Sequence, residues 1–262
     1  LTLAPSTGSG PAAHERPRRG KFLADLGVIP AGEVLITGGK IAAVGSKVEA
    51  PADAEIIEAQ GRVLMPGFVD CHTHACWAGD RLDEWEQRLR GVPYLEILKA
   101  GGGIHATVRA VRAATKKQLA AHLKERLAAM IREGTTTVEI KSGYGLQTEE
   151  ELKMLRAIVR AGNEWPGTIV PTALLGHAFE GNLEEYARMV VKEMLPAVAK
   201  EFPGITVDAF CEDGAWTLEA CVRFFEKAAK HHPLRVHTDQ FTSLGMIPEA
   251  IRLGARSVDH LE

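Results

Sequence analysis

The sequence predicts an α/β protein whose main domain is a (β/α)8 barrel of the TIM type. Beyond residue 66, short apolar runs alternate with amphipathic helical stretches, a pattern typical of parallel β/α architecture. Candidate site residues follow several of those apolar runs in turn, as they do at the C-terminal face of a barrel. A doubly wound sheet would instead place a glycine-rich turn after its first strand, where this chain carries histidines.

The N-terminal part is predicted to be a small β domain. Two β-rich runs on either side of a Gly-Gly pair indicate a hairpin over Glu33–Gly45. A further strand is predicted at Ala54–Ala59, and no helical pattern precedes the barrel. We therefore expect residues 1–65 to form part of an accessory β domain and residues 66–262 to form the barrel.

Six strands are expected in the barrel region, and the first leads into the histidine pair His72 and His74. The other five are predicted at Thr135–Ile140, Thr168–Ala173, Thr206–Phe210, Leu234–His237 and the run ending at His260. The helices between them are predicted at Lys116–Glu133, Thr148–Ala161, Leu183–Lys200, Leu218–His231 and Ile247–Leu253. Thr148 is expected to cap its helix, with Glu151 completing the capping box.

Six strands are two short of a closed barrel. We therefore expect the chain to be incomplete at its C-terminus, and to be inactive and poorly folded on its own. The complete protein is expected to have roughly 400 residues, the length of an eight-stranded barrel with accessory strands. A glycine run, Gly101–Gly103, lies in the long connection after the first strand and lacks the spacing of a phosphate-binding loop. A flexible active-site loop is the better interpretation.

Composition excludes several classes of partner. The 262 residues are 45% hydrophobic and carry a net charge of −3, which is ordinary for a globular protein and gives no reason to expect nucleic acid. No stretch of about 18 apolar residues is present, so no membrane span is expected. The four cysteines lack the spacing of a zinc knuckle or a disulfide framework, and Cys71 and Cys76 are expected to be buried. A reducing cytoplasm is the expected location.

A metal site is predicted around the histidine pair. On a strand, residues i and i+2 point to the same face, so His72 and His74 would converge on one point. Imidazole nitrogen is a common ligand of zinc, and His237, at a later strand end, is the best candidate for a third ligand. Taken alone, His237 could equally be a core histidine that is hydrogen-bonded to the backbone. Three imidazoles leave room for another ligand and a water. His260, beside Asp259, could orient or deprotonate that water, or could be structural.

Other polar residues at strand ends have two interpretations each. Arg81 offers a fork that fits a carboxylate, or a surface ion pair with Asp83 or Glu84. Lys141 could become a carbamate that bridges two metals, although the Ser-Gly-Tyr-Gly stretch after it favours a substrate loop. Glu212 and Asp213 are either acids that support the site or loop charges. Tyr94 and Tyr144 lie in glycine-bearing loops, where pocket lining is more typical than burial in the core.

Several segments resemble a known family. PGFVDCHTH (66–74) is similar to a motif of the amidohydrolase superfamily, whose accessory β-sandwich the N-terminal strands also resemble. More narrowly, YLEILKAGGGI (94–104), TTTVEIKSGYGL (135–146), LLGHA (174–178), HTDQ (237–240) and DHLE (259–262) resemble the imidazolonepropionase family. The resemblance implies hydrolytic ring opening of 4-imidazolone-5-propanoate to N-formimidoyl-L-glutamate, a step of histidine degradation.

The resemblance also implies roles for particular residues. One Zn2+ or Fe3+ ion would be bound by His72, His74 and His237, together with an aspartate of the eighth strand, which would follow Glu262. The substrate, a small molecule with a carboxylate, would contact Arg81, Tyr94, Tyr144, His177 and Gln240. The catalytic residues would be His260 and Gln240. A homodimer is left open as the assembly, with no nucleic-acid or membrane partner.

Two other classes of function remain open. One is a different amidohydrolase on the same barrel, either another cyclic amidase or a deaminase. Related deaminases carry glutamate three residues after the strand-five histidine, where this chain has Gln240. A glutamine amide cannot titrate but can hold a polar ring edge, which favours ring hydrolysis with His260 handling the proton. The other class is a non-catalytic homologue that binds a metal or a ligand.

Overall fold

The structure, a computed structural model, describes residues 20–93, 96–97 and 100–262. Contacts divide the chain into an N-terminal unit, Leu1–Gly67, and a C-terminal unit, Phe68–Glu262. No described helix is long and apolar enough to cross a membrane.

The N-terminal unit contains one antiparallel hairpin, formed by β1 (Glu33–Thr37) and β2 (Lys40–Gly45). The two residues of its turn, Gly38 and Gly39, have φ values of 59° and 74°, which glycine adopts without strain. The predicted hairpin is therefore confirmed. A short 3-10 helix at Gly20–Ala24 was not predicted.

The predicted strand at Ala54–Ala59 is wrong. These residues have no regular secondary structure, and Ile56 and Ile57 are 81% and 85% exposed. A strand exists only where a neighbour supplies hydrogen bonds, and no described segment pairs with this one. The described residues of the N-terminal unit therefore show a hairpin and no second sheet.

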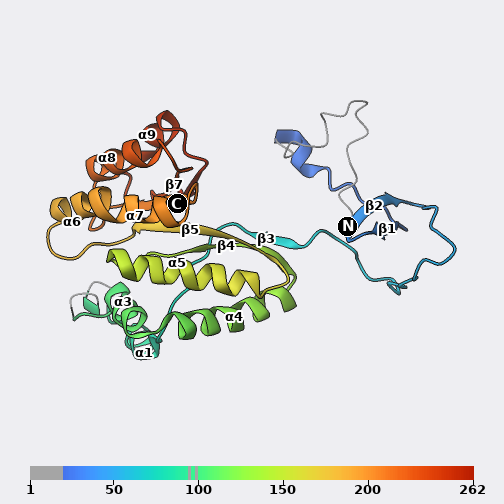
Figure 1. Ribbon diagram of the computed structural model, residues 1–262, viewed down its shortest axis with the longest axis horizontal. Coiled ribbons are helices and arrows are strands. Elements are labelled where there is room, and N and C mark those ends of the chain that lie inside the picture. Colours follow the sequence, from blue (N-terminus) through green and yellow to red (C-terminus); the bar gives the residue numbers. More distant parts are fainter. Residues whose placement is uncertain (1–19, 94–95, 98–99) are drawn as a thin grey trace. The chain divides into compact units, whose positions relative to one another are not determined.

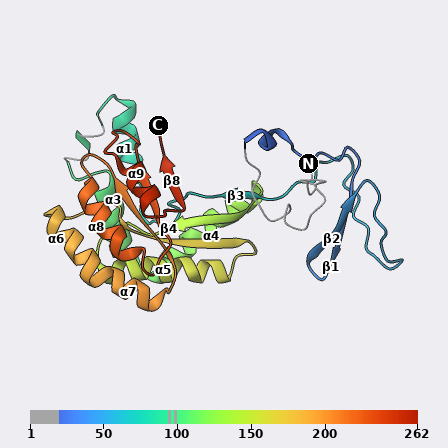
Figure 2. The ribbon, with the colours of Figure 1, turned by 90° about the horizontal axis from the view of Figure 1, so that it is seen from above.

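The C-terminal unit is a mixed α/β structure built on a curled parallel sheet that forms half a barrel (Figures 1 and 2). Its strands lie in sequence order and pair in parallel, which confirms the predicted succession of six strands. They are β3 (Phe68–Asp70), β4 (Thr135–Lys141), β5 (Thr168–Gly176), β6 (Thr206–Cys211), β7 (Arg235–Thr238) and β8 (Ser257–His260). Their carboxyl ends therefore meet at one edge of the sheet.

The described helices are α1 (Leu82–Leu89), α3 (Ile104–Ala113), α4 (Lys116–Arg132), α5 (Thr148–Asn163), α6 (Leu183–Met189), α7 (Leu195–Glu201), α8 (Leu218–Ala228) and α9 (Met246–Arg252). Helices α4 and α5 lie side by side and run along the inner strands of the sheet (Figure 1). Leu119, Leu123 and Leu127 form the predicted apolar face of α4 and are completely buried. The core lies between this layer of helices and the sheet.

Helices α1 and α3 occupy a connection that was expected to be a loop. Helix α3 buries Thr107, Val108 and Val111; Val111 lies four residues after Thr107 and three after Val108, so all three share one face. The glycine run precedes α3, and the N–H of Gly103 donates to Glu84 Oε1 at 2.9 Å.

Two predicted helices differ in detail. The stretch Leu183–Lys200 contains a π-helical turn, Val190–Met194, between α6 and α7. Pro196 lies at the start of α7, where it lacks an N–H and its ring crowds the carbonyl one turn earlier, so the preceding turn widens. The capping box of α5 is also wrong: Gln147 is the N-cap, without a side-chain bond, and Glu151 binds elsewhere.

Candidate metal centre

His72 and His74 lie just beyond β3 on a segment that continues along β4. The N–H of Lys141 donates to the carbonyl of Thr73 at 3.1 Å, and the Thr73 hydroxyl donates to the carbonyl of Glu139 at 2.6 Å. Thr73 is therefore tied to β4. Its two histidine neighbours lie with their ring centroids 5.4 Å apart.

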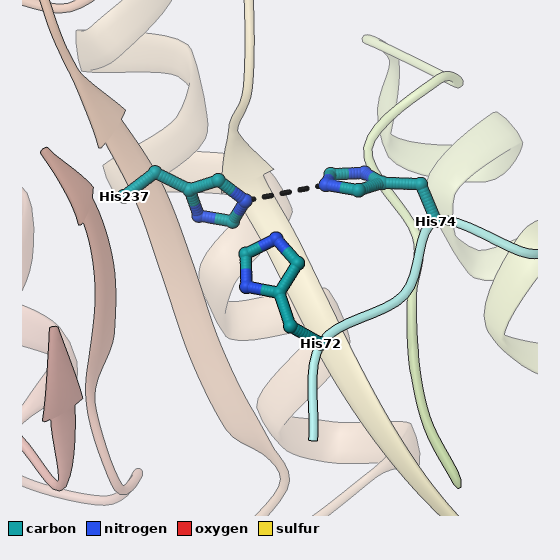
Figure 3. A group of neighbouring side chains, drawn as sticks. All are labelled: His72, His74 and His237. Atoms are coloured by element: carbon teal, nitrogen blue, oxygen red, sulfur yellow. Dashed lines mark hydrogen bonds between the residues drawn. The ribbon is translucent and has the colours of Figure 1, made fainter. Parts of the chain in front are cut away.

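His237, near the end of β7, brings a third imidazole to the same place, and the three rings face one another (Figure 3). Nε2 of His237 lies 3.2 Å from Nε2 of His74, and the rings of His72 and His237 are 4.5 Å apart. Each histidine offers one nitrogen to a group whose atoms all lie within 4.8 Å of one another. The structure thus brings together the three histidines that the sequence predicted as metal ligands.

The cluster fits a cation. Two nitrogens bound to one tetrahedral zinc at about 2.0–2.1 Å lie about 3.3–3.4 Å apart, close to the separation of the two Nε2 atoms. Burial lowers the pKa of His74 well below its ordinary value, and the neighbouring His177 and His237 lower it further. The imidazole of His74 is therefore neutral near pH 7 and offers a lone pair. A cation placed between His74 and His237 would accept a lone pair from each of the two facing nitrogens.

Two carboxylates lie next to the Nδ1 atoms of His237 and His72. Asp208 Oδ1 lies 3.1 Å from Nδ1 of His237, and Asp259 Oδ2 lies 3.4 Å from Nδ1 of His72. A carboxylate in this position fixes the tautomer and orientation of a ligating histidine. Burial alone would raise the pKa of Asp208, but the adjacent His237 and Lys141 outweigh it and hold that pKa below its usual range.

A buried network of charges supports these carboxylates. The Lys141 ammonium is fully buried and lies 2.9 Å from both Glu139 Oε1 and Asp208 Oδ2. Glu139 also accepts the N–H of Thr73 at 3.2 Å. Arg235 lies 3.6 Å from Glu139 and 3.7 Å from Asp259. Nζ of Lys141 is already engaged by two carboxylates, which argues against the carbamate interpretation.

Sequence reasoning missed Glu139 and Asp208. A signal for the first was available: Glu139 lies between the apolar Val138 and Ile140 of a predicted strand, and a charge that such a strand buries requires a partner. Asp208 lies at the interior of a short strand with no motif around it, so only the fold places it beside His237.

Three further predicted residues surround the cluster. The ring of His177 stacks on that of His74 at 5.0 Å, and the ring of Tyr144 lies 5.1 Å from His177. Nδ1 of His177 is 3.0 Å from the carbonyl of Gly143, so it carries the proton that this bond requires. Burial, with the nearby His237, lowers the pKa of His177 to about 4. The ring of His260 is 5.4 Å from those of both His72 and His237, and its pKa is lowered by burial and by these two neighbours.

No hydrogen bond joins the side chains of Arg81 or Gln240 to the clustered histidines, and Tyr94 is not among the described residues. Arg81 is the N-cap of α1, and its exposed side chain forms no hydrogen bond or ion pair with a described residue, including Asp83 and Glu84. The main-chain N–H of Gln240 donates to Glu212 Oε2 at 3.2 Å. Tyr94 lies outside the described residues.

Glu212 and the cysteines have clear structural roles. The buried Glu212 carboxylate accepts the N–H groups of Phe241 and Thr242 at 2.9 Å each, and so holds the loop after β7; Asp213 is exposed. Cys76 is buried, which raises the pKa of its thiol to about 12. The prediction that Cys71 is also buried is wrong, because it is exposed at the turn out of β3.

Comparison with known proteins decides the family. The model of the amidohydrolase family matches residues 55–257, about three quarters of the chain. The chain belongs to the amidohydrolase family. Amidohydrolases are metal-dependent hydrolases, in agreement with the group of three histidines. The membership of the amidohydrolase superfamily that the PGFVDCHTH motif predicted is thereby confirmed.

Individual relatives give a narrower likeness. The chain is 46% identical to the imidazolonepropionase of Herpetosiphon aurantiacus, over 97% of this chain and 62% of that protein. It is 43% identical to the imidazolonepropionase of Rubrobacter xylanophilus, over 94% of this chain and 61% of that protein. The chain thus spans less than two thirds of the length of these relatives. Among solved structures, the ochratoxinase of A. niger is 15% identical to this chain, with a TM-score of 0.45. The match covers 83% of this chain and 53% of the ochratoxinase chain.

Proposed function

We propose that the protein opens the ring of 4-imidazolone-5-propanoate by hydrolysis and yields N-formimidoyl-L-glutamate, a step of histidine degradation. The observation that carries the proposal is the cluster of His72, His74 and His237, bordered on its rim by His177, Tyr144 and His260. The relatives named imidazolonepropionase, at 43% and 46% identity over nearly all of the chain, support this choice of substrate.

In this proposal the three clustered histidines hold one Zn2+ or Fe3+ ion. A cation bound there would lower the pKa of a water molecule and polarise the ring carbonyl. The neutral His74 and the two carboxylate-held imidazoles, His72 and His237, are set to present lone pairs to it. One nitrogen of each of the three histidines already lies within 4.8 Å of the other two.

His260 has the role of proton carrier, which rests on its position and on the family resemblance. Its ring lies equally close to His72 and His237, at the end of β8. The attacking water gives a proton to His260 as its oxygen bonds to the ring carbonyl carbon. The same proton then passes to the ring nitrogen as the carbon–nitrogen bond breaks, so that the reaction consumes one water and needs no other reactant.

The substrate contacts are assigned from the same placement. His177 uses its Nδ1 proton on Gly143, which leaves Nε2 to accept a hydrogen bond from a ring N–H. The ring of Tyr144 lies beside that of His177. Arg81, exposed and without a described partner, would bind the propionate, and Gln240 would hold a polar edge of the ring; Tyr94 keeps its predicted contact.

The finer architecture belongs to the same proposal. An amidohydrolase of this kind would close the half barrel with further strands and complete an accessory β-sandwich, with residues 1–65 and 66–262 as the two domain segments. The homodimer and the cytoplasmic location also stay predictions, and light scattering on the purified full-length protein checks the first.

The test uses the full-length protein and two matched variants. Turnover is followed as loss of imidazolonepropionate absorbance, with metal content measured on the same samples. We expect His237→Ala to lose both the metal and the activity, and His231→Ala, an exposed histidine away from the cluster, to keep both. The proposal fails if the metal-loaded protein does not consume the substrate, or if His237→Ala keeps stoichiometric metal and the full rate.

A further inference from the structure

One buried carboxylate, on helix α5, binds the main chain of the loop between β4 and α5. Glu151, which is 1% exposed, lies in the first turn of α5. Its Oε2 accepts the N–H of Gly143 at 2.8 Å, and its Oε1 accepts those of Gly145 and Leu146 at 2.7 and 2.9 Å. Both carboxylate oxygens are therefore used as acceptors for main-chain donors of this one loop.

The same loop shapes the rim of the histidine cluster. It carries Tyr144, whose ring lies 6.1 Å from His74, and the carbonyl of Gly143 fixes Nδ1 of His177. Arg112, on helix α3, also binds the loop: its Nε donates to the carbonyl of Gly145 at 2.8 Å. Two hydrogen bonds to Glu180 hold the guanidinium in place. The loop is thus fixed from two sides and transmits its position to two residues of the rim.

Little room is left for the loop to take another path. Gly143 has a φ of 110°, and a Cβ there would lie 3.0 Å from Nδ1 of His177. A Cβ on Gly145 would lie 2.6 Å from the main chain of Glu150 and Glu151. Because the loop packs directly on both α5 and His177, a shift of the loop must shift the imidazole as well.

The burial of a carboxylate here has a cost that the loop offsets. Burial raises the pKa of Glu151, and the three main-chain donors act in the opposite direction. A carboxylate at the N-terminus of a helix also meets the positive end of the helix dipole. A residue needed only for packing would be apolar, so the three main-chain donors of the loop account for the acid.

We propose that Glu151 is a positioning residue: it fixes the 143–146 loop so that Tyr144 and the Nδ1-protonated form of His177 are preset to bind the heterocyclic ring of the substrate. Substrate affinity therefore depends on Glu151, whereas metal binding does not, because Glu151 contacts none of the three clustered histidines. The inference rests on the proposed function for the identity of the substrate.

Glu151→Gln tests the proposal at nearly constant volume. A glutamine has one acceptor oxygen and one NH2 group, so at least one loop N–H would face another donor. We expect KM to rise roughly 10- to 100-fold, the scale expected when a binding group is misplaced by about 1 Å, with kcat within about threefold of wild type and metal content unchanged. Glu149→Gln is the matched control, because Glu149 lies in the same helical turn with its side chain in solvent, and it should keep both parameters.

A purely structural role predicts a different result. The variant would then melt at a lower temperature and contain fewer active molecules, but the surviving molecules would keep the wild-type KM, and this outcome overturns the proposal. If Glu151→Gln does not fold, Arg112→Gln decides, since Arg112 is only partly buried and holds the same loop through Gly145. A raised KM in Arg112→Gln supports the proposal, and an unchanged KM overturns it.

Imidazole 15N NMR separates this inference from the proposed function. The shifts of His177, assigned with a His177→Ala sample, report which ring nitrogen carries the proton, whether or not the protein consumes the substrate. We expect the Nδ1-protonated form in wild type and a mixture of forms in the Glu151 or Arg112 variant. An unchanged tautomer in the folded variants overturns the positioning role even where the proposed function holds, whereas a protein without turnover but with this tautomer change would refute only the proposed function.

Discussion

Replacing Lys141 with methionine should destabilise the protein strongly. The ammonium is fully buried and lies 2.9 Å from each of two carboxylates, Glu139 and Asp208, which are 3% and 0% exposed. Methionine has a similar volume but no charge, so the substitution leaves two buried acids without their shared partner. Breaking a buried ion pair from one side costs about 3–5 kcal/mol, because the remaining charge is uncompensated.

The measurement is urea unfolding of the full-length protein, followed by circular dichroism, with Lys124→Met as the matched control. Lys124 pairs with Glu164 at the surface, where both side chains are 44% exposed, and such pairs contribute about 0–1 kcal/mol. We expect the free energy of unfolding to fall by about 3–5 kcal/mol in Lys141→Met and by less than about 1 kcal/mol in the control. Equal losses in the two variants would refute the reasoning, as would a loss below about 1 kcal/mol in Lys141→Met.

Two further predictions concern the loop after β7. Gln240→Glu should raise KM for the imidazolone, because a carboxylate cannot donate the hydrogen bonds of the amide. For the wild-type protein, a coupled ammonia assay should detect no efficient release of ammonia from guanine, cytosine or adenosine. Efficient ammonia release by the wild-type protein would contradict the assignment to ring hydrolysis. Glu212→Gln should also raise KM, because Glu212 accepts the N–H groups of Gln240 and Phe241, whereas the exposed Asp213→Asn should not. Equal KM values in these two variants would show that the loop does not orient the substrate.

The parts of the fold that the sequence predicts well are those fixed by local periodicity. The apolar spacing of Leu119, Leu123 and Leu127 was sufficient to place α4 and its buried face. The strand pattern at Ala54–Ala59 was misleading, because a strand also depends on a neighbour that its own residues do not specify. The predicted β-sandwich has the same dependence on partner strands, and the described N-terminal residues show only one hairpin.

The site residues likewise divide into those that the sequence predicts and those that it does not. His72, His74 and His237 could be predicted because all three lie at or just beyond the carboxyl ends of parallel strands, which meet at one edge of the sheet. Glu151 could not, because its spacing from Thr148 matches a capping box equally well. Only the path of the 143–146 loop, set by two glycines packed against α5 and His177, shows which donors the carboxylate meets.

The most direct test of the central claim, metal-dependent ring opening at the three-histidine cluster, is removal and return of the metal. The full-length protein would be stripped with a chelator, titrated with Zn2+ or iron, and assayed for loss of imidazolonepropionate absorbance at each step. We expect activity to disappear with the metal and to return in proportion to bound ion, saturating at about one equivalent per chain, as a site of three imidazoles with an open position requires. Full turnover by the stripped protein, or a return of activity that is equally complete in the His237→Ala variant, would contradict it.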